Sequence, residues 1–232
     1  MTKRKTLWAC LAVCLVAILA FGSLAYFTAK DGAENTFLVA GYDPEHPEEF
    51  DPDSLFSIKV YEHKVDENGK QMEPAEEVKA NEYKNIQPGD VLDKDPTVEN
   101  TGKYSAYIRV KVTVDKGSEW KAILGDDLTK LFGGLDADKW TKDGSTSMTM
   151  EGSDLAHLST KYTYTYYLNE PLEPGSTATL FDTVNIPAEM TVEQLATVPA
   201  FHVSISAEAI QSKNTGDTPQ EAFKLYDAQV KK

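Results

Sequence analysis

The sequence predicts an all-β protein, an antiparallel jelly roll or β-sandwich with short helical insertions and a C-terminal helix. Two observations lead to this fold class. Strand-length runs with alternating apolar and polar residues recur along the chain, and Pro–Gly or Asn–Gly turns separate them. Apolar residues at helical spacing occupy only short stretches, whereas a doubly wound α/β fold needs a helix after almost every strand.

The N-terminus has the three parts of a secretory signal peptide. The basic residues Lys3–Lys5 precede an apolar core, Leu7–Phe21, and the small residues Ser23 and Ala25 follow two positions apart. This order predicts cleavage after Ala25, just before Tyr26, so that residues 1–25 form the signal peptide. The alternative is a retained membrane anchor, because the uncharged stretch is just long enough to span a bilayer.

Cleavage changes the composition of the chain. Both cysteines, Cys10 and Cys14, lie in the removed segment, so the mature protein has no disulfides and no thiol nucleophile. Three of the 23 basic residues are also removed, which leaves 20 against 37 acidic ones and a formal charge of −17. Such a chain is not expected to bind nucleic acid or anionic lipid, and any membrane contact would be through an uncleaved signal segment.

The mature chain opens with a short apolar strand at 36–42. The acidic segment 43–53 contains three prolines and is a loop, since proline cannot donate to a strand ladder. Ser54–His63 alternates in the manner of a half-buried strand. Asn68-Gly69, within the turn 66–70, is typical of a hairpin.

The second group of strands follows a Pro–Gly turn at 87–90. One strand is predicted at Val91–Glu99, and the strongest alternation in the chain predicts another at Tyr104–Val114. The second of these has a core-facing set and a solvent-facing set: Ala106, Ile108, Val110, Val112 and Val114 on one side, and Tyr107, Arg109, Lys111 and Thr113 on the other.

The middle of the chain has a different pattern. Apolar residues at helical spacing over Glu119–Phe132 predict a helical insert, which Gly125 divides into two short pieces. A short strand is predicted at Ser145–Met150.

Strands return in the last third of the chain, again separated by a Pro–Gly turn at 173–176. The predicted domain is therefore a sandwich over 26–215, with its helical insert near 119–132. A polar tail with a short helix follows at 216–232. The elements predicted here are strands at Lys161–Leu168, Ala178–Ile186 and Ala200–Gln211 and helices at Thr191–Leu195 and Gln220–Val230.

Several of these stretches together resemble the TasA/camelysin family of exported proteins. The N-terminal pattern is Gly or Ser, then Ala-Tyr-Phe-Thr, then Asn-Thr-Phe; a Pro-Gly-Asp turn, a strand ending in Asn-x-Gly and a late Pro–Gly turn follow. Ala29 departs from the pattern, since many members have Asp there. The matching positions are Gly22, Ser23, Ala25, Tyr26, Phe27, Thr28, Asn35, Thr36, Phe37, Gly41, Pro88, Gly89, Asp90, Asn100, Gly102, Arg109, Pro174, Gly175 and Ala207–Gln211.

The resemblance implies a jelly-roll subunit or accessory of extracellular biofilm-matrix fibres on a Gram-positive cell surface. It also implies processing by a signal peptidase of the SipW type, and self-association in which an N-terminal strand of one subunit pairs with the next subunit or a related matrix subunit. An added strand satisfies the unpaired backbone groups of a sheet edge. The expected assembly strand is Thr36, Phe37, Leu38, Val39, Ala40, Gly41 and Tyr42. The same residues also suit the first strand of their own sandwich, and this alternative stays open.

Camelysin-like members of the family are described as metalloproteases, so a secreted metalloprotease is the enzyme alternative. A common protease zinc site needs two His four residues apart on one helix with a Glu between them. His46, His63, His157 and His202 are all farther apart than that, which leaves only a site assembled from distant residues. No catalytic residue, metal ligand or cofactor site is therefore predicted.

Two further features of the sequence suggest possible binding sites, but each also has a purely structural interpretation. The acidic loop 43–53 offers oxygen ligands for Ca²⁺ but lacks the spacing of a calcium-binding loop. Tyr162, Tyr164 and Tyr166 form a row that suits either a glycan or partner platform or packing against a second sheet. A monomeric surface adhesin is the third function class, beside the fibre subunit and the protease.

Overall fold

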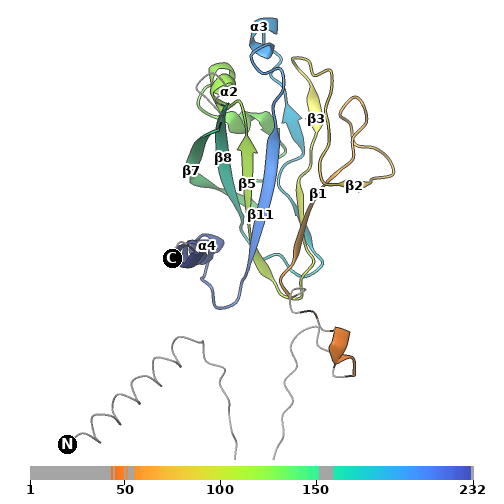
Figure 1. The fold of residues 1–232 in the computed structure, drawn as a ribbon, viewed down its shortest axis with the longest axis vertical. Helices are drawn as coiled ribbons and strands as arrows, with labels where there is room; N and C mark the ends of the chain where they lie inside the picture. Colours follow the sequence, from red (N-terminus) through yellow and green to blue (C-terminus); the bar gives the residue numbers. More distant parts are fainter. Residues whose placement is uncertain (1–42, 44, 50, 52–54, 152–158, 231–232) are drawn as a thin grey trace, which may run out of the picture. The chain divides into compact units, whose positions relative to one another are not determined.

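The computed structural model describes residues 43, 45–49, 51, 55–151 and 159–230. They form the all-β antiparallel sandwich predicted from the sequence, with short helices and a C-terminal helix (Figure 1). None of the described helices is both long and apolar enough to cross a membrane. The predicted cleavage region, Ser23, Ala25 and Tyr26, and the predicted assembly strand, Thr36–Tyr42, lie outside the described residues.

One layer is a four-stranded antiparallel sheet in the order β11-β5-β8-β7. Its centre is β5, which pairs with β11 along its whole length and with β8 on the other side. The strand bounds are Ala106–Val114 for β5, Trp140–Glu151 for β7, Ser159–Leu168 for β8 and Val203–Gln211 for β11.

The facing layer consists of two shorter sheets, in the orders β2-β1-β4-β9 and β3-β10-β6. Here two of the predicted strands are each interrupted: Val91–Glu99 becomes β3 and β4, and Ala178–Ile186 becomes β9 and β10. The strand bounds are Ile58–His63 for β1, Glu77–Val78 for β2, Val91–Asp93 for β3, Thr97–Asn100 for β4, Phe132–Gly133 for β6, Thr177–Thr179 for β9 and Thr183–Asn185 for β10.

The interruption has a local cause. Pro96 has no N–H and cannot donate to the ladder. The register nevertheless continues across the gap, since Asp93 lies opposite Thr183 and Thr97 lies opposite Thr179. The two short sheets are therefore one bent ribbon, and the buried Phe181 fills the bend.

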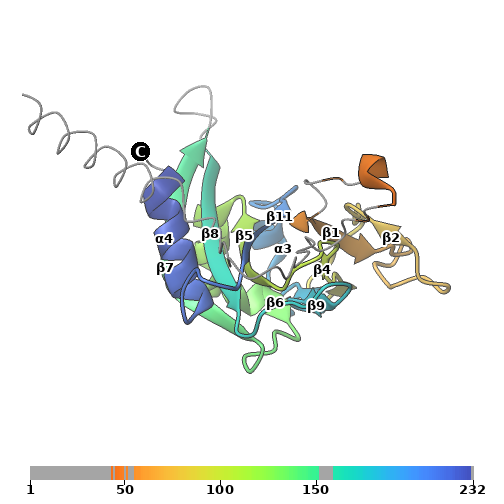
Figure 2. The same cartoon turned by 90° about the horizontal axis from the view of Figure 1, so that it is seen from below.

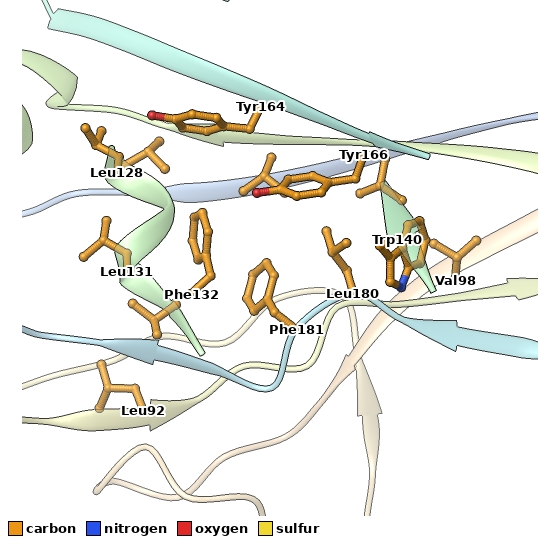
Figure 3. Packing of buried hydrophobic residues seen from close by; sticks show 14 of the residues in the cluster. Leu92, Val98, Leu128, Leu131, Phe132, Trp140, Tyr164, Tyr166, Leu180 and Phe181 are labelled. Carbon is orange, nitrogen blue, oxygen red and sulfur yellow. The ribbon is translucent and has the colours of Figure 1, made fainter. Parts of the chain in front are cut away.

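The core lies between the two layers (Figure 3). The inward side chains of β5 meet those of β3, β4 and β10, and the short segment 180–181 adds Leu180 and Phe181. Tyr164 and Tyr166 are part of this core, with exposed fractions of 3% and 1%. The tyrosine row therefore packs against the opposite layer and is not a surface platform.

Apart from η1, which lies in the segment 43–53 predicted to be a loop, the short helices lie where the sequence predicts them, with small shifts of their ends. The predicted insert is α2 and a 3-10 helix, η3, and Gly125 at the end of α2 has a φ of 81°, which is why the helix stops there. Thr191 and Gln194 form a capping box that begins α3. The helix bounds are Pro47–Glu49 for η1, Gly117–Leu124 for α2, Leu128–Leu131 for η3, Val192–Leu195 for α3 and Pro219–Val230 for α4.

Three sequence predictions need correction. The strand predicted at Ser54–His63 corresponds to β1, which begins at Ile58, although the carbonyls of Leu55 and Ser57 accept hydrogen bonds from Lys103 and Thr101. The strand predicted at Ser145–Met150 is twice as long, because an edge strand with both faces largely exposed needs no apolar alternation. A register shift between Lys142 and Thr146 interrupts its ladder.

The third correction concerns the outer face of β5. Tyr107 and Arg109 were predicted to face solvent, but their exposed fractions are only 8% and 5%. The C-terminal helix α4 lies across this face of the sheet, on the side away from β1, β4 and β9 (Figure 2). Phe223 of α4 is fully buried there, so part of the outer face forms a second small core.

Candidate functional site: an open strand position between β1 and β11

The free edge of β11 is the first wall of the candidate site. In an antiparallel pair the N–H and C=O of one residue point to the same side, and successive residues alternate. The Asp115 N–H donates to the His202 carbonyl, and the Ser212 N–H donates to the Ser105 carbonyl. Even-numbered residues of β11 therefore bond to β5, and the odd-numbered ones turn their backbone groups to the other edge. No described strand pairs with that edge.

The outer edge of β1 is the second wall. The Thr101 N–H donates to the Ser57 carbonyl, so odd-numbered residues of β1 face β4. Ile58, Val60 and Glu62 turn their backbone groups to the opposite edge. Glu62 is covered by its pairing with Val78, but β2 ends at that residue. The backbone groups of Ile58 and Val60 therefore have no strand beside them among the described residues.

These two edges lie next to each other (Figure 1). β1 is antiparallel to β4, and β11 is antiparallel to β5. Because the chain reverses its direction between β4 and β5, β1 and β11 are also antiparallel to each other. The side chains that accompany the free edges pack on the main core but stay partly exposed: Ile58, Val60, Val203, Ile205, Ala207 and Ala209. Unpaired backbone beside half-covered apolar side chains makes these two edges candidate acceptors for one added strand. A strand between them needs about 9.5 Å, so the two edges have to separate where they lie closest.

A cavity of about 820 Å³ opens at one end of this position. It reaches Val60 and Glu62 late in β1 and Val203 to Ile205 early in β11. Its far walls come from α2, β3, β10 and the loop after α3, and the segment 79–86 borders it on the outside. Trp120, which is fully buried and edge-on to Phe201 with ring centroids 4.9 Å apart, forms part of the apolar wall. Its indole N–H has no partner among the described residues.

The polar part of the cavity is an ion pair between Glu62 and Lys94, whose side chains are 6% and 8% exposed. Sequence reasoning missed this pair. Its signal was the alternation itself: Glu62 continues the core-facing set of Ile58 and Val60, and Lys94 continues that of Leu92. Two charges of opposite sign on core-facing positions predict a buried pair.

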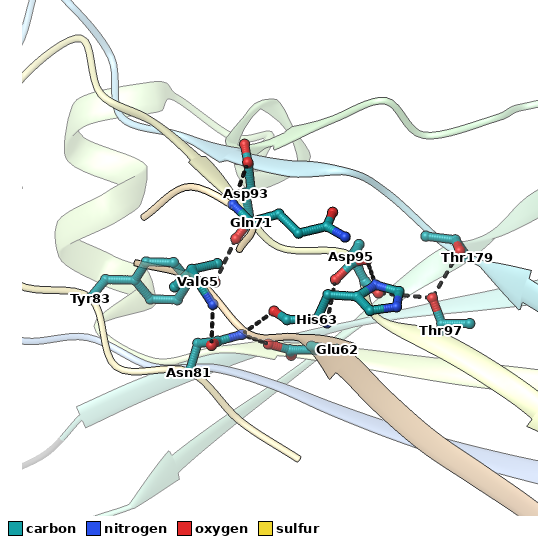
Figure 4. Close-up of polar contacts among 10 residues, drawn as sticks. All are labelled: Glu62, His63, Val65, Gln71, Asn81, Tyr83, Asp93, Asp95, Thr97 and Thr179. Carbon is teal, nitrogen blue, oxygen red and sulfur yellow. Dashed lines mark hydrogen bonds and ion pairs between the residues drawn. The ribbon is translucent and has the colours of Figure 1, made fainter. Parts of the chain in front are cut away.

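The segment 79–86 is held mainly by side chains (Figure 4). The Asn81 amide donates to Glu62 and to the His63 carbonyl, at 3.3 and 2.9 Å, and accepts from the Val65 N–H at 3.0 Å. The Tyr83 hydroxyl donates to the Asp93 carbonyl at 2.7 Å, and burial raises the pKa of this tyrosine. These hydrogen bonds of Asn81 hold the chain beside residues 62–65. The chain after β2 therefore does not continue as a strand along Val60.

Two histidines bind aspartates in the same way, near the cavity end of the two strands. His63 is 2.5 Å from Asp95 through Nδ1 and also donates its backbone N–H to that carboxylate. His202 does the same with Asp115. Among the described residues no group of three or more His, Cys, Asp and Glu side chains is placed to hold a metal ion. His46 lies 3.6 Å from Glu48, and His157 is outside the described residues.

Comparisons with known proteins identify no relative: no family model, no curated protein and no solved structure matches this chain.

Proposed function

We propose that this protein is a secreted structural protein, a subunit or accessory of extracellular biofilm-matrix or surface fibres that assemble by β-strand addition. The open strand position between β1 and β11 is the observation that supports the proposal. Backbone pairing supplies affinity in strand addition, and pockets for alternate side chains supply specificity. This site has both unpaired backbone groups on its two edges and a cavity for a side chain.

The entering strand in this proposal is Thr36–Tyr42 of a neighbouring subunit. It ends immediately before Asp43, the first described residue, and it is apolar on both faces. Seven extended residues span roughly 23 Å. That is the length of β11 from Val203 to Ala209, whose outer backbone edge pairs with no strand of the described part of the chain.

Removing or breaking the entering strand tests the proposal. The mature chain is expected to form filaments in electron microscopy, whereas a chain that begins at Tyr42 stays monomeric in light scattering. Val39→Pro, which removes one backbone donor and restricts the preceding residue, is expected to block growth without unfolding the domain. A truncated chain that is unfolded, beside a mature chain that is strictly monomeric, would show that the strand belongs to its own domain. The monomeric adhesin would then be the better proposal.

Export is part of the same proposal, through processing by a signal peptidase of the SipW type. Mature protein isolated from the culture medium is expected to begin at Tyr26 or Phe27, because Ser23 and Ala25 fit the shallow pockets that precede a signal-peptidase cut. N-terminal sequencing by mass spectrometry measures this directly. Recovery of chains that still begin at Met1 would indicate a retained anchor and argue against free fibres.

The metalloprotease alternative has its own test. Purified mature protein is expected to contain less than stoichiometric zinc by elemental analysis and to leave casein intact. The reason is that each of the described histidines His46, His63 and His202 contacts a single carboxylate. A chelator is expected to change neither result. Stoichiometric zinc together with casein cleavage that the chelator abolishes would favour the protease over the structural protein.

A further inference from the structure

The cavity lies at only one end of the open strand position. On β11 the inward residues change from Val203 and Ile205 at one end to Ala207 and Ala209 at the other, and only the first two line the cavity. On β1 the cavity reaches Val60 but not Ile58. A strand that fits this position needs a large side chain at the cavity end and a small one at the alanine end.

The segment 36–42 has one face with that gradient. Alternate residues of an extended chain share a face, so Phe37, Val39 and Gly41 lie together in decreasing order of size. The opposite face carries Leu38 and Tyr42 on either side of Ala40, so it is large at both ends. Only the first face decreases steadily in one direction.

We propose that the cavity is a binding site for the phenyl ring of Phe37 from the neighbouring subunit, an inference that depends on the strand addition proposed above. The entering strand then runs parallel to β11 and antiparallel to β1, with Gly41 against the alanines. The acidic segment that follows Tyr42 leaves the position at the end away from the cavity.

The chemistry of the cavity suits an apolar aromatic ring. Trp120 and Phe201 already meet edge-on in its wall, and a third ring extends such an arrangement. Glu62 and Lys94 neutralise each other, and Asn81 donates to Glu62, so the polar part needs no charge from the incoming side chain. The volume of about 820 Å³ accommodates a phenyl ring together with the backbone that carries it.

Single substitutions in the full mature chain test the inference, with the critical concentration for filament growth as the measurement. Phe37→Ala is expected to raise it at least about tenfold, because a buried phenyl group is removed. Leu38→Ala is the matched control: a neighbouring residue of similar size on the opposite face, expected to change the value by less than about threefold. Gly41→Phe is expected to block growth, since Ala207 and Ala209 line no cavity.

Each outcome separates the inference from the strand addition on which it depends. If Tyr42→Ala or Leu38→Ala raises the critical concentration more than Phe37→Ala does, the strand enters with its other face inward and this inference is wrong. If Val39→Pro blocks growth but Phe37→Ala has no effect, strand addition holds and the phenyl site is wrong. If Val39→Pro and Phe37→Ala both leave growth unchanged, strand addition itself is wrong.

A second measurement addresses the acceptor side. Ala200 is exposed at the rim of the cavity, so Ala200→Trp is expected to narrow the entrance and raise the critical concentration without disturbing the core. If Phe37 enters this cavity, the effects of Ala200→Trp and Phe37→Ala in one chain are expected to be less than additive. Fully additive effects would place Phe37 elsewhere. Circular dichroism of each variant confirms that the domain is folded.

Discussion

Ala207→Pro is expected to abolish filament growth and leave the sandwich folded. Ala207 is an odd-numbered residue of β11, so its N–H points to the free edge and makes no bond to β5. Proline is tolerated on an edge strand when the missing N–H faces outward, and the residue before it is already extended. A strand that pairs with this edge, however, no longer receives the hydrogen bond from the N–H of residue 207, and the proline ring stands in its way.

Ser206→Pro is the matched control for this prediction. Ser206 lies opposite Lys111 and turns its N–H toward β5, so proline there breaks the internal ladder. We expect it to lower the free energy of unfolding by about 1–3 kcal/mol, the cost of an unsatisfied buried backbone group. Urea denaturation and electron microscopy of both variants give the comparison. Normal filaments from Ala207→Pro would show that assembly does not use this edge.

The strands were predictable wherever apolar residues on one face alternate with mostly polar residues on the other. β5, β8 and β11 have period-two patterns because alternate side chains of each strand pack on the main core. β7 was predicted at half its length because an exposed edge strand places no demand on its side chains. The interruption at Pro96 has a local cause in the sequence, but the matching break at 180–182 depends on how the sheet bends over the core, which is a property of the whole sandwich.

The candidate site was predictable only in part. The acidic and basic residues at the core-facing positions of Glu62 and Lys94 were visible in the alternation, and they predict a buried pair without saying which strands bring it together. The open position between β1 and β11 depends on strand order, because a free edge is defined by the strand that is not beside it. No local pattern encodes that absence. The apolar segment 36–42 was recognisable, but its acceptor was not.

The C-terminal helix is a second place where the sequence pattern alone was insufficient. Arg109 lies on the face of β5 that the sequence predicts to be solvent-facing, and its partners are about a hundred residues away. Its guanidinium donates to both carboxylate oxygens of Asp227, at 2.7 and 2.9 Å, to Glu208 at 2.6 Å, and stacks over the Phe223 ring at 4.4 Å. Burial opposes the charge of Glu208, but the bonds from Arg109 and Lys111 outweigh it and lower the pKa of this carboxyl.

This cluster has a pH dependence with a definite sign. A carboxyl whose pKa is lower in the folded protein contributes stability that is present above its unfolded value, about 4.3 for Glu. That contribution is lost as the pH falls through the lower folded value. The stability that Glu208 adds to the pairing of β11 with β5 is therefore expected to be lost below about pH 4, and salt is expected to weaken it further because Glu208 is partly exposed.

Phe223→Ala is expected to destabilise the domain by about 3–5 kcal/mol, the usual cost of removing a buried phenyl ring. Phe223 is fully buried against Tyr107 and Tyr167 and lies under Arg109. Leu225→Ala, two residues along the same helix at a side chain that is 55% exposed, is the matched control and is expected to cost less than about 1 kcal/mol.

Urea denaturation of the two variants measures the difference. Since small domains are stable by only about 5–15 kcal/mol, the loss expected for Phe223→Ala is a large part of the total. The slope of the transition is expected to stay the same if α4 unfolds together with the sandwich. Equal costs for the two substitutions would mean that α4 is not docked in solution, and Arg109 would then be a charged residue on an open sheet face. A large cost at Phe223 alone would establish α4 as an integral part of the sandwich, because an unattached tail contributes nothing to the unfolding of the strands.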